Sequence, residues 1–191
     1  MPIPSLQSSS SKISSYGTIS YPTQGLTWLH TEGRWIKDSY GKTIRLLGAT
    51  RVDTRYNCKD IHDVDEIDYE LFERSGANCL RLMLNKYYWD NEPDVYIPKI
   101  DQIVSWCKDR GIRVVFNFAQ DSVRSIEWNY DAKINALENP DDWINWWISL
   151  AERYLDEPTV CAFEIFNEPP PYFAWEEHEY SKEQADALWW N

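Results

Sequence analysis

The sequence lacks most features that mark metal proteins, nucleic-acid binders and membrane proteins. Its four cysteines form no C-x-x-C pair and its three histidines are scattered, so no zinc site is indicated. Lys and Arg number 19 against 31 Asp and Glu, and the net charge of −12 would repel phosphate backbones and anionic membranes. No stretch approaches the roughly 20 apolar residues of a membrane span. We therefore expect no nucleic-acid or membrane partner, no metal and no other cofactor.

The amino-terminal segment is poor in residues that build a core. Residues 1–25 are rich in serine and contain neither a basic start nor an apolar run of about 7 to 15 residues, so no export or anchoring signal is visible. We predict a disordered leader or linker over residues 1–25 and a folded domain over residues 26–191. Cys79 and Cys161 fall in predicted strands and Cys107 in a predicted helix, which favours reduced thiols, Cys58 included.

From residue 28 onward the sequence alternates short apolar runs with helical patterns. This alternation predicts parallel strands joined by helical crossovers, an α/β fold. A hairpin of residues 34–37 and 43–48 leads into the first strand, and an exit loop begins at residue 49. Later strands are predicted at 78–84, 112–118 and 160–166. Helices are predicted at 64–75, with Ile67, Leu71 and Phe72 inward, from about 97 to 111, and from 139 to 154, with Trp143 and Trp147 as core residues.

The segment Phe163–Pro170 is the most informative one. Its apolar run ends in Asn-Glu-Pro, a pattern typical of a buried strand that delivers a carboxylic acid to its carboxyl-terminal tip, where barrel enzymes keep their chemistry. Flanking prolines confine the strand, so Glu168 lies at its exit. Asn-Glu-Pro alone is also a common strand-to-loop junction.

Three tryptophans lie in segments that follow predicted strands, namely Trp89, Trp128 and Trp175. In an α/β barrel those segments form the face that holds the active site, and flat apolar rings suit the faces of sugars. The alternative is that these rings merely pack loops against the barrel rim.

Three segments together carry a family resemblance: residues 76–82 (GANCLRL), 111–118 (GIRVVFNF) and 163–169 (FEIFNEP). In order and spacing they resemble the second, third and fourth strands of glycoside hydrolase family 5, the cellulase-like branch of the clan A barrel glycosidases. The resemblance extends over about residues 30–175. It implies a (β/α)8 barrel of which this chain carries about the first four βα units, the amino-terminal half.

The resemblance also implies roles for individual residues. Glu168 is the general acid and base, Asn167 contacts the sugar beside the bond to be cut, and Arg81 helps to hold the catalytic carboxylates. A buried acid with a raised pKa suits a poor leaving group, and a guanidinium is an always-charged donor that orients carboxylates. Arg81 alone is also consistent with a salt bridge inside the barrel.

The sequence departs from the family pattern at two strand ends. Thr50 stands where family members commonly carry Asn, and Ala119 followed by Gln120 stands where they carry His. Both changes remove sugar-contacting groups, and Gln120 remains a candidate supporting residue.

The retaining mechanism of the family needs a nucleophilic carboxylate about 5 to 5.5 Å from the acid, supplied by the seventh strand. We find no such residue in this chain. Glu164 lies about 13 Å below Glu168 at ~3.3 Å per strand residue, so we interpret it as a hydrogen-bonded structural acid. Asp121 offers only a less favoured inverting scheme. A half-barrel has open sheet edges and should dimerise, bind a missing carboxyl-terminal half, or aggregate.

Three functions follow for testing. The leading one is hydrolysis of O-glycosidic bonds in a β-linked polysaccharide of the cellulase or β-glycanase type. The second is a non-catalytic carbohydrate-binding remnant or inactive fragment that lacks the nucleophile, and the third is an unrelated α/β domain. The family resemblance implies an extracellular location, although the sequence shows no signal for it.

Overall fold

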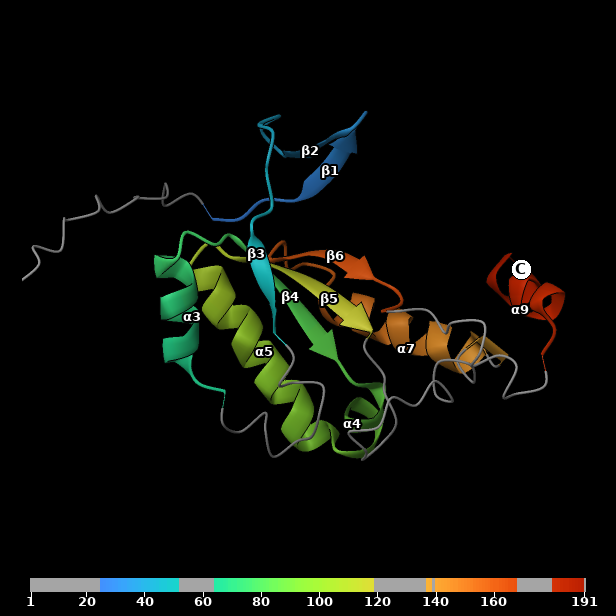
Figure 1. Ribbon diagram of the computed structural model, residues 1–191. Coiled ribbons are helices and arrows are strands. Elements are labelled where there is room, and N and C mark those ends of the chain that lie inside the picture. The colour runs from blue at the N-terminus through green and yellow to red at the C-terminus, as the bar shows by residue number, and fades with distance from the viewer. Residues whose placement is uncertain (1–24, 52–63, 119–136, 139, 168–179, 191) are drawn as a thin grey trace, which may run out of the picture.

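The computed structural model describes residues 25–51, 64–118, 137–138, 140–167 and 180–190 (Figure 1). Secondary structure alternates as the sequence predicts. The elements are β1 (Leu29–Glu32), β2 (Trp35–Asp38), β3 (Gly48–Arg51), α3 (Glu66–Arg74), β4 (Cys79–Leu84), α4 (Lys86–Asn91), α5 (Pro93–Asp109), β5 (Arg113–Phe118), α7 (Pro140–Arg153), β6 (Val160–Glu164) and α9 (Lys182–Trp190).

The central element is a four-stranded sheet in the order β3-β4-β5-β6, with every neighbouring pair parallel. Helices α3, α5 and α7 lie along one face of this sheet (Figure 1). Parallel neighbours in sequence order, joined by helices, are what consecutive βα units of a barrel produce. The predicted α/β class with a parallel sheet is confirmed.

The hydrophobic core lies between the sheet and these helices. Alternate strand residues point toward the helices and are at most 2% exposed: Leu80, Leu82, Leu84, Val114, Phe116 and Phe118. The helices contribute Tyr96, Ile100, Ile103 and Cys107 from α5 and Trp146 and Leu150 from α7. Because strand side chains alternate between faces, the intervening residues occupy the opposite, inner face of the sheet.

Helix α3 matches its predicted limits, but of its predicted core residues only Phe72 packs against the core, where it is partly buried. Asp65 caps it by accepting a hydrogen bond from the Ile67 N–H at 2.9 Å, and Gly76 ends it with a φ of 81°. The inward residue is Tyr69, whose ring lies against Trp106 of α5. Ile67 and Leu71 are 57% and 58% exposed, so this part of the prediction is wrong. Helix α3 packs on α5 along one side, which leaves its outward side exposed.

Helix α7 keeps its predicted limits, whereas α5 begins earlier than predicted. Helix α5 begins at Pro93 and carries Pro98 inside it, and the short helix α4 was not predicted. The residue that α7 buries most deeply near its start is Trp146, whereas Trp143 and Trp147 are only partly buried against the core.

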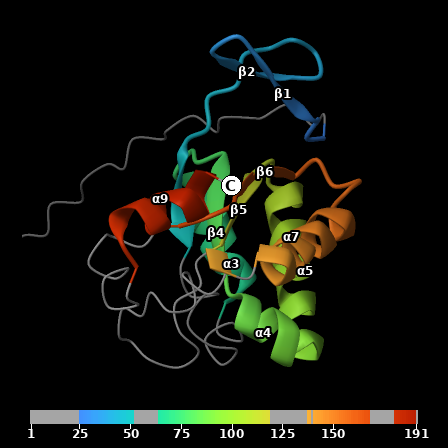
Figure 2. The ribbon, with the colours of Figure 1, turned by 90° about the vertical axis from the view of Figure 1, so that its right-hand side faces the viewer.

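The amino-terminal hairpin also differs from the predicted one. Strands β1 and β2 pair with each other across a turn at Gly33, whose φ is 58°. The predicted contact between the two later segments survives only as a bridge between Lys37 and Thr43. The first parallel strand, β3, begins at Gly48, the last residue of the predicted hairpin, and continues through residues 49–51, which were predicted as the exit loop. In Figure 2 the hairpin stands apart from the four-stranded sheet.

Strand β3 approaches β4 closely at Gly48. A Cβ atom built at this position would lie 1.6 Å from the carbonyl oxygen of Cys79. The Leu47 N–H just before it donates to the Asn78 side-chain oxygen at 2.7 Å. Glycine therefore permits the first parallel pairing of the sheet.

Cys79, Cys107 and Cys161 are free thiols, while Cys58 lies outside the described residues. Burial raises the pKa of Cys107 to about 12. The predicted leader over residues 1–25 also lies outside the described residues, apart from Gly25. Within the described ranges, every helix is too short or too polar to cross a membrane.

Candidate active site

The candidate site is built from polar side chains on the inner face of the sheet, opposite the helices. Arg81 on β4 is flanked by Leu80 and Leu82, which point into the core, so its own side chain points the other way. Val115 of β5 lies on the same inner face, because it pairs with Arg81 and the next residue, Phe116, points into the core. Glu164 of β6 also lies there, because it pairs with Asn117, two residues after Val115.

Arg81 and Glu164 form a two-point ion pair across the intervening strand. Arg81 Nε lies 2.5 Å from Glu164 Oε2, and Nη2 lies 2.5 Å from Oε1. The two side chains are 28% and 38% exposed. A fork of this kind fixes both the position and the plane of the guanidinium. Glu164 is the hydrogen-bonded inner acid that the sequence predicts.

Arg81 also reaches the Asn-Glu-Pro segment. Its Nη2 atom donates to Asn167 Oδ1 at 2.8 Å, across 86 positions of sequence. Asn167 is 6% exposed, and its backbone N–H donates to the Phe118 carbonyl at 3.0 Å. The pairing of β5 with the β6 segment thus continues past the end of β6. Two of the sequence-predicted site residues, Arg81 and Asn167, are brought into direct contact.

The predicted acid itself, Glu168, lies outside the described residues, as do Gln120, Trp128 and Trp175. Asn167 nevertheless fixes where the chain enters that segment. It stands at the carboxyl end of β6, three residues after Glu164, on the side of the sheet where barrel enzymes hold their catalytic groups.

Trp89 lies within the described residues and does not offer an open ring face. It belongs to helix α4, is 9% exposed, and packs edge to face against Trp146 with ring centroids 6.2 Å apart. This placement corresponds to the packing alternative for this residue. The position of Trp89 after a strand could not show whether it lies in a loop or, as observed, in a short helix that buries its ring.

Asn117 is a polar inner-face residue that the sequence argument did not single out. It is completely buried, is paired in register with Met83 and Glu164, and its amide has no hydrogen-bond partner within the described part of the chain. The available signal was an asparagine inside an otherwise apolar strand, at an inner position. A buried amide at that point marks the inner face as polar over both β5 and β6.

A pocket of about 280 Å³ opens beside Arg81 on the inner face. It lies toward the β3 edge and includes the position where the sequence departs from the family pattern, Thr50. Its lining residues are Leu46, Gly48, Ala49, Thr50, Cys79, Arg81 and Val115.

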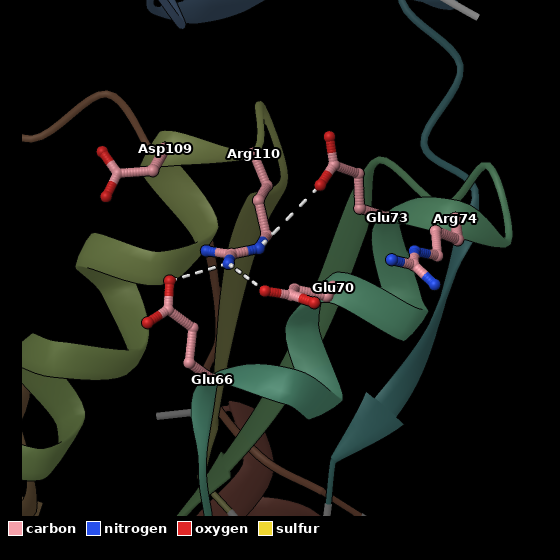
Figure 3. A pocket seen from close by; sticks show the side chains of 6 residues that line it. All are labelled: Glu66, Glu70, Glu73, Arg74, Asp109 and Arg110. Atoms are coloured by element: carbon pink, nitrogen blue, oxygen red, sulfur yellow. Dashed lines mark hydrogen bonds and ion pairs between the residues drawn. The ribbon is translucent and has the colours of Figure 1, made fainter. Parts of the chain in front are cut away.

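A second pocket, of about 410 Å³, lies away from the carboxyl ends of the strands, between α3 and the end of α5 (Figure 3). The Arg110 guanidinium occupies its centre and contacts Glu66 at 2.7 Å, Glu70 at 3.8 Å and Glu73 at 3.9 Å. These contacts tie α3 to the end of α5, and the Arg110 guanidinium itself fills the position toward which the three carboxylates point (Figure 3). Among the described residues, no group of three His, Cys, Asp or Glu side chains is arranged to hold a metal ion.

Similar proteins were identified by sequence. The family model for cellulase, glycosyl hydrolase family 5, matches residues 38–188. Endoglucanase G of Acetivibrio thermocellus is 26% identical over 74% of this chain and 32% of its own length. Endoglucanase B of the same organism is 26% identical over 87% of this chain and 33% of its own length. The chain thus spans about a third of these relatives.

Solved structures give the same picture of the fold. An endogalactoceramidase superposes with a TM-score of 0.61 at 20% identity, over 85% of this chain and 50% of that chain. A β-glucanase from Saccharophagus degradans in complex with cellotetraose superposes with a TM-score of 0.57 at 21% identity, over 91% of this chain and 55% of that chain. At these identities the likeness concerns the fold, and it covers about half of each barrel. Together with the family match over most of the sequence, it shows that this chain belongs to glycosyl hydrolase family 5, the cellulase family.

Proposed function

We propose that this chain supplies the acid/base half of an active site that hydrolyses β-linked glycans. The observation that carries the proposal is the bonded set Arg81, Glu164 and Asn167, which fixes the residue directly before Glu168 at the carboxyl end of a parallel strand. In this proposal Glu168 protonates the leaving glycosidic oxygen and later activates water.

The chemistry explains why such rigidity is useful. A glycosidic oxygen leaves readily only when it is protonated, so the acid must be held within hydrogen-bond reach of that atom. Misplacement by about 1 Å costs roughly 100-fold in rate. The ion pair to Glu164 and the backbone bond from Asn167 to Phe118 anchor the approach to Glu168 from two sides.

The proposed substrate class is a β-linked glucan or a close relative of it. Two of the similar proteins are named endoglucanases, and one similar structure holds cellotetraose. The strong negative charge of this chain suits a neutral polysaccharide better than an acidic one.

The second carboxylate of a retaining mechanism is proposed to come from further βα units that pair with β3 or β6, the outermost strands of the sheet. Side chains near both outer strands support this arrangement. Leu47 next to β3 is 47% exposed, and Phe163 and Ile165 at β6 are 41% and 54% exposed. Strands of a parallel sheet are normally covered on both faces, so these positions suit contact with additional units of the same kind.

The test is release of reducing ends from soluble β-1,4-glycans by the chain assembled with βα units that carry the second carboxylate, such as the carboxyl-terminal half-barrel of a family 5 endoglucanase, compared with Glu168→Gln in the same assembly. We expect turnover to fall roughly 100- to 10,000-fold in the variant while cellotetraose binding, measured by calorimetry, persists. Glu152→Gln, an exposed acid on α7, is the matched control and should leave both readouts unchanged.

Binding without turnover in the unmodified assembly, which carries both carboxylates, would replace this proposal by the carbohydrate-binding alternative. Equal turnover in the protein and in Glu168→Gln would remove Glu168 from the chemistry. The absence of both binding and turnover in the assembly would contradict a glycan-directed function for the chain.

A further inference from the structure

The contacts of Arg81 settle which way the Asn167 side chain faces. We propose that Glu164 is a positioning residue that acts through Arg81. It fixes the Asn167 amide so that the NH₂ group, and not the oxygen, is presented to the substrate. This inference rests on the proposed function for its ligand, but its structural part is testable without one.

The first step is the fork between Glu164 and Arg81. Nε and Nη2 of Arg81 each donate to a different oxygen of the Glu164 carboxylate, both at 2.5 Å. Two parallel bonds define the plane of the guanidinium as well as its position. The direction of the second Nη2 hydrogen is therefore determined by Glu164.

The second step is the contact of that nitrogen with Asn167. A guanidinium has donors and no acceptor, so the Asn167 atom that faces it must be the oxygen. The observed contact, from Nη2 to Oδ1 at 2.8 Å, has this sense. The usual ambiguity between the oxygen and nitrogen of an asparagine amide is thus resolved by a chemical constraint.

The third step is the fixed backbone of Asn167. Its N–H donates to the Phe118 carbonyl, and only 6% of the residue is exposed. With the main chain held and Oδ1 engaged by Arg81, the NH₂ group points away from Arg81. A side chain held in this way presents hydrogen-bond donors to whatever occupies the strand ends.

This orientation selects a substrate chemistry. An NH₂ donor recognises an oxygen acceptor, such as a sugar hydroxyl, and has no attraction for an ammonium group, which can only donate. We therefore infer discrimination at this contact between hydroxylated sugars and amino sugars that carry a positive charge. A site built to donate to a hydroxyl rejects an analogue that leaves its donor unpaired.

The experiment compares the unmodified protein with Glu164→Gln, Asn167→Asp and the exposed control Glu152→Gln. Calorimetry gives affinities for cellotetraose and for the fully deacetylated glucosamine tetrasaccharide, in one buffer at one salt concentration. Urea unfolding of each protein gives the change in stability separately.

Asn167→Asp keeps an oxygen for Arg81 and replaces the presented donor by an acceptor. Its cellotetraose affinity should fall at least tenfold and its relative affinity for the glucosamine oligomer should rise, with no loss of stability. Glu164→Gln should shift the ratio of the two affinities in the same direction, because the guanidinium plane is no longer fixed. An unchanged ratio in Glu164→Gln would overturn the positioning role, even if that variant were less stable.

A second readout separates this inference from the proposed function. With selectively ¹⁵N-labelled asparagine, the Asn167 side-chain NH₂ pair is assigned by its loss in Asn167→Asp. We expect a sharp, dispersed pair in the unmodified protein that moves toward the positions of exposed asparagines in Glu164→Gln. If this shift occurs in a protein that binds no glycan, the proposed function fails and the positioning by Glu164 stands. If the pair is identical in both proteins, the inference fails whatever the protein binds.

Discussion

The two faces of the four-stranded sheet are built from the same strands but from different chemistry. On the helix side, six residues from β4 and β5 are at most 2% exposed and all are apolar: Leu80, Leu82, Leu84, Val114, Phe116 and Phe118. On the inner side, the alternate residues include Arg81, Asn117 and Glu164, joined at the strand end by Asn167.

This difference indicates that the helix side of the sheet contributes most of the stability, whereas the inner side carries the candidate site. Apolar side chains on the helix side gain free energy by leaving water, in proportion to the area buried. Polar groups on the inner side gain little net free energy and must find partners, which restricts their geometry. Substitutions on the helix side should therefore appear in unfolding experiments, and those on the inner side in binding experiments.

The largest expected effect is on the helix side, at Phe118. Its ring is fully buried and lies within 6.4 Å, centroid to centroid, of the rings of Trp143, Trp146, Trp147 and Phe166. Phe118→Ala should lower the free energy of unfolding by about 3 to 5 kcal/mol, because a buried cavity remains. Urea unfolding measures it. Val115→Ala, on the inner face of the same strand, is the control and should cost less than half as much. Equal costs would contradict the division between the faces.

The next effect is at Gly48, where β3 meets β4. Gly48→Ala places a Cβ where the Cys79 carbonyl oxygen lies, so the strand must shift, at a cost near the top of the roughly 1 to 3 kcal/mol range for overpacking. Gly76→Ala is the comparison. It has open space but a φ of 81°, and should cost about 1 kcal/mol from backbone strain alone. If Gly48→Ala were as stable as Gly76→Ala, β3 could shift away from β4 at little cost in free energy, which would contradict this prediction.

The sequence was sufficient for the central strands and for α3. Apolar runs of six or seven residues between a glycine and a polar loop predict buried parallel strands, and β4 and β5 lie within the predicted ranges. An acidic cap at Asp65 and a glycine at 76 define α3. These signals are local, so no tertiary information was needed.

Elements that depend on distant contacts could not be predicted. Helix α4 is six residues long, begins at the Asn85 cap, and is tied to α5 by a hydrogen bond from the Asn85 N–H to the Tyr96 hydroxyl at 2.9 Å. Two glycines, Gly33 and Gly41, both adopt positive φ, so the sequence offered two turns for one hairpin.

The candidate site could likewise be predicted from the sequence only in part. Alternation along β4 and β6 places Arg81 and Glu164 on one face, and the Asn-Glu-Pro motif places Asn167 at the strand end. Which atoms meet depends on side-chain rotamers across 83 positions of sequence, and no local pattern determines those.

A smaller effect sharpens the comparison on the inner face. Glu164→Gln should lower the free energy of unfolding by no more than about 1 kcal/mol, because its side chain is 38% exposed and water screens the ion pair. The same variant should change glycan selectivity, as argued above. Urea unfolding beside Phe118→Ala provides the check. A loss comparable to that of the phenylalanine variant would show that the inner face also carries the fold.

The smallest effect concerns a contact between two helices, outside both faces of the sheet. Asp101 of α5 accepts hydrogen bonds from Arg153 and, at 2.8 Å, from the Tyr154 hydroxyl. Burial alone would raise the pKa of Asp101, but the bonds from Arg153 and Tyr154 outweigh it and hold the pKa below the ordinary value of 3.8. A pKa lowered by folding means that the carboxylate stabilises the protein above about pH 3.8 and that this contribution disappears as the pH falls through the lowered pKa.

Asp101→Asn should therefore cost at most about 1 kcal/mol at pH 7, since the pair is partly exposed, and the difference from the unmodified protein should shrink below pH 3.8. Urea midpoints measured from pH 7 to pH 3, with the exposed Asp156→Asn as control, test this, and a difference that stays constant across the range would remove Asp101 from the pH response.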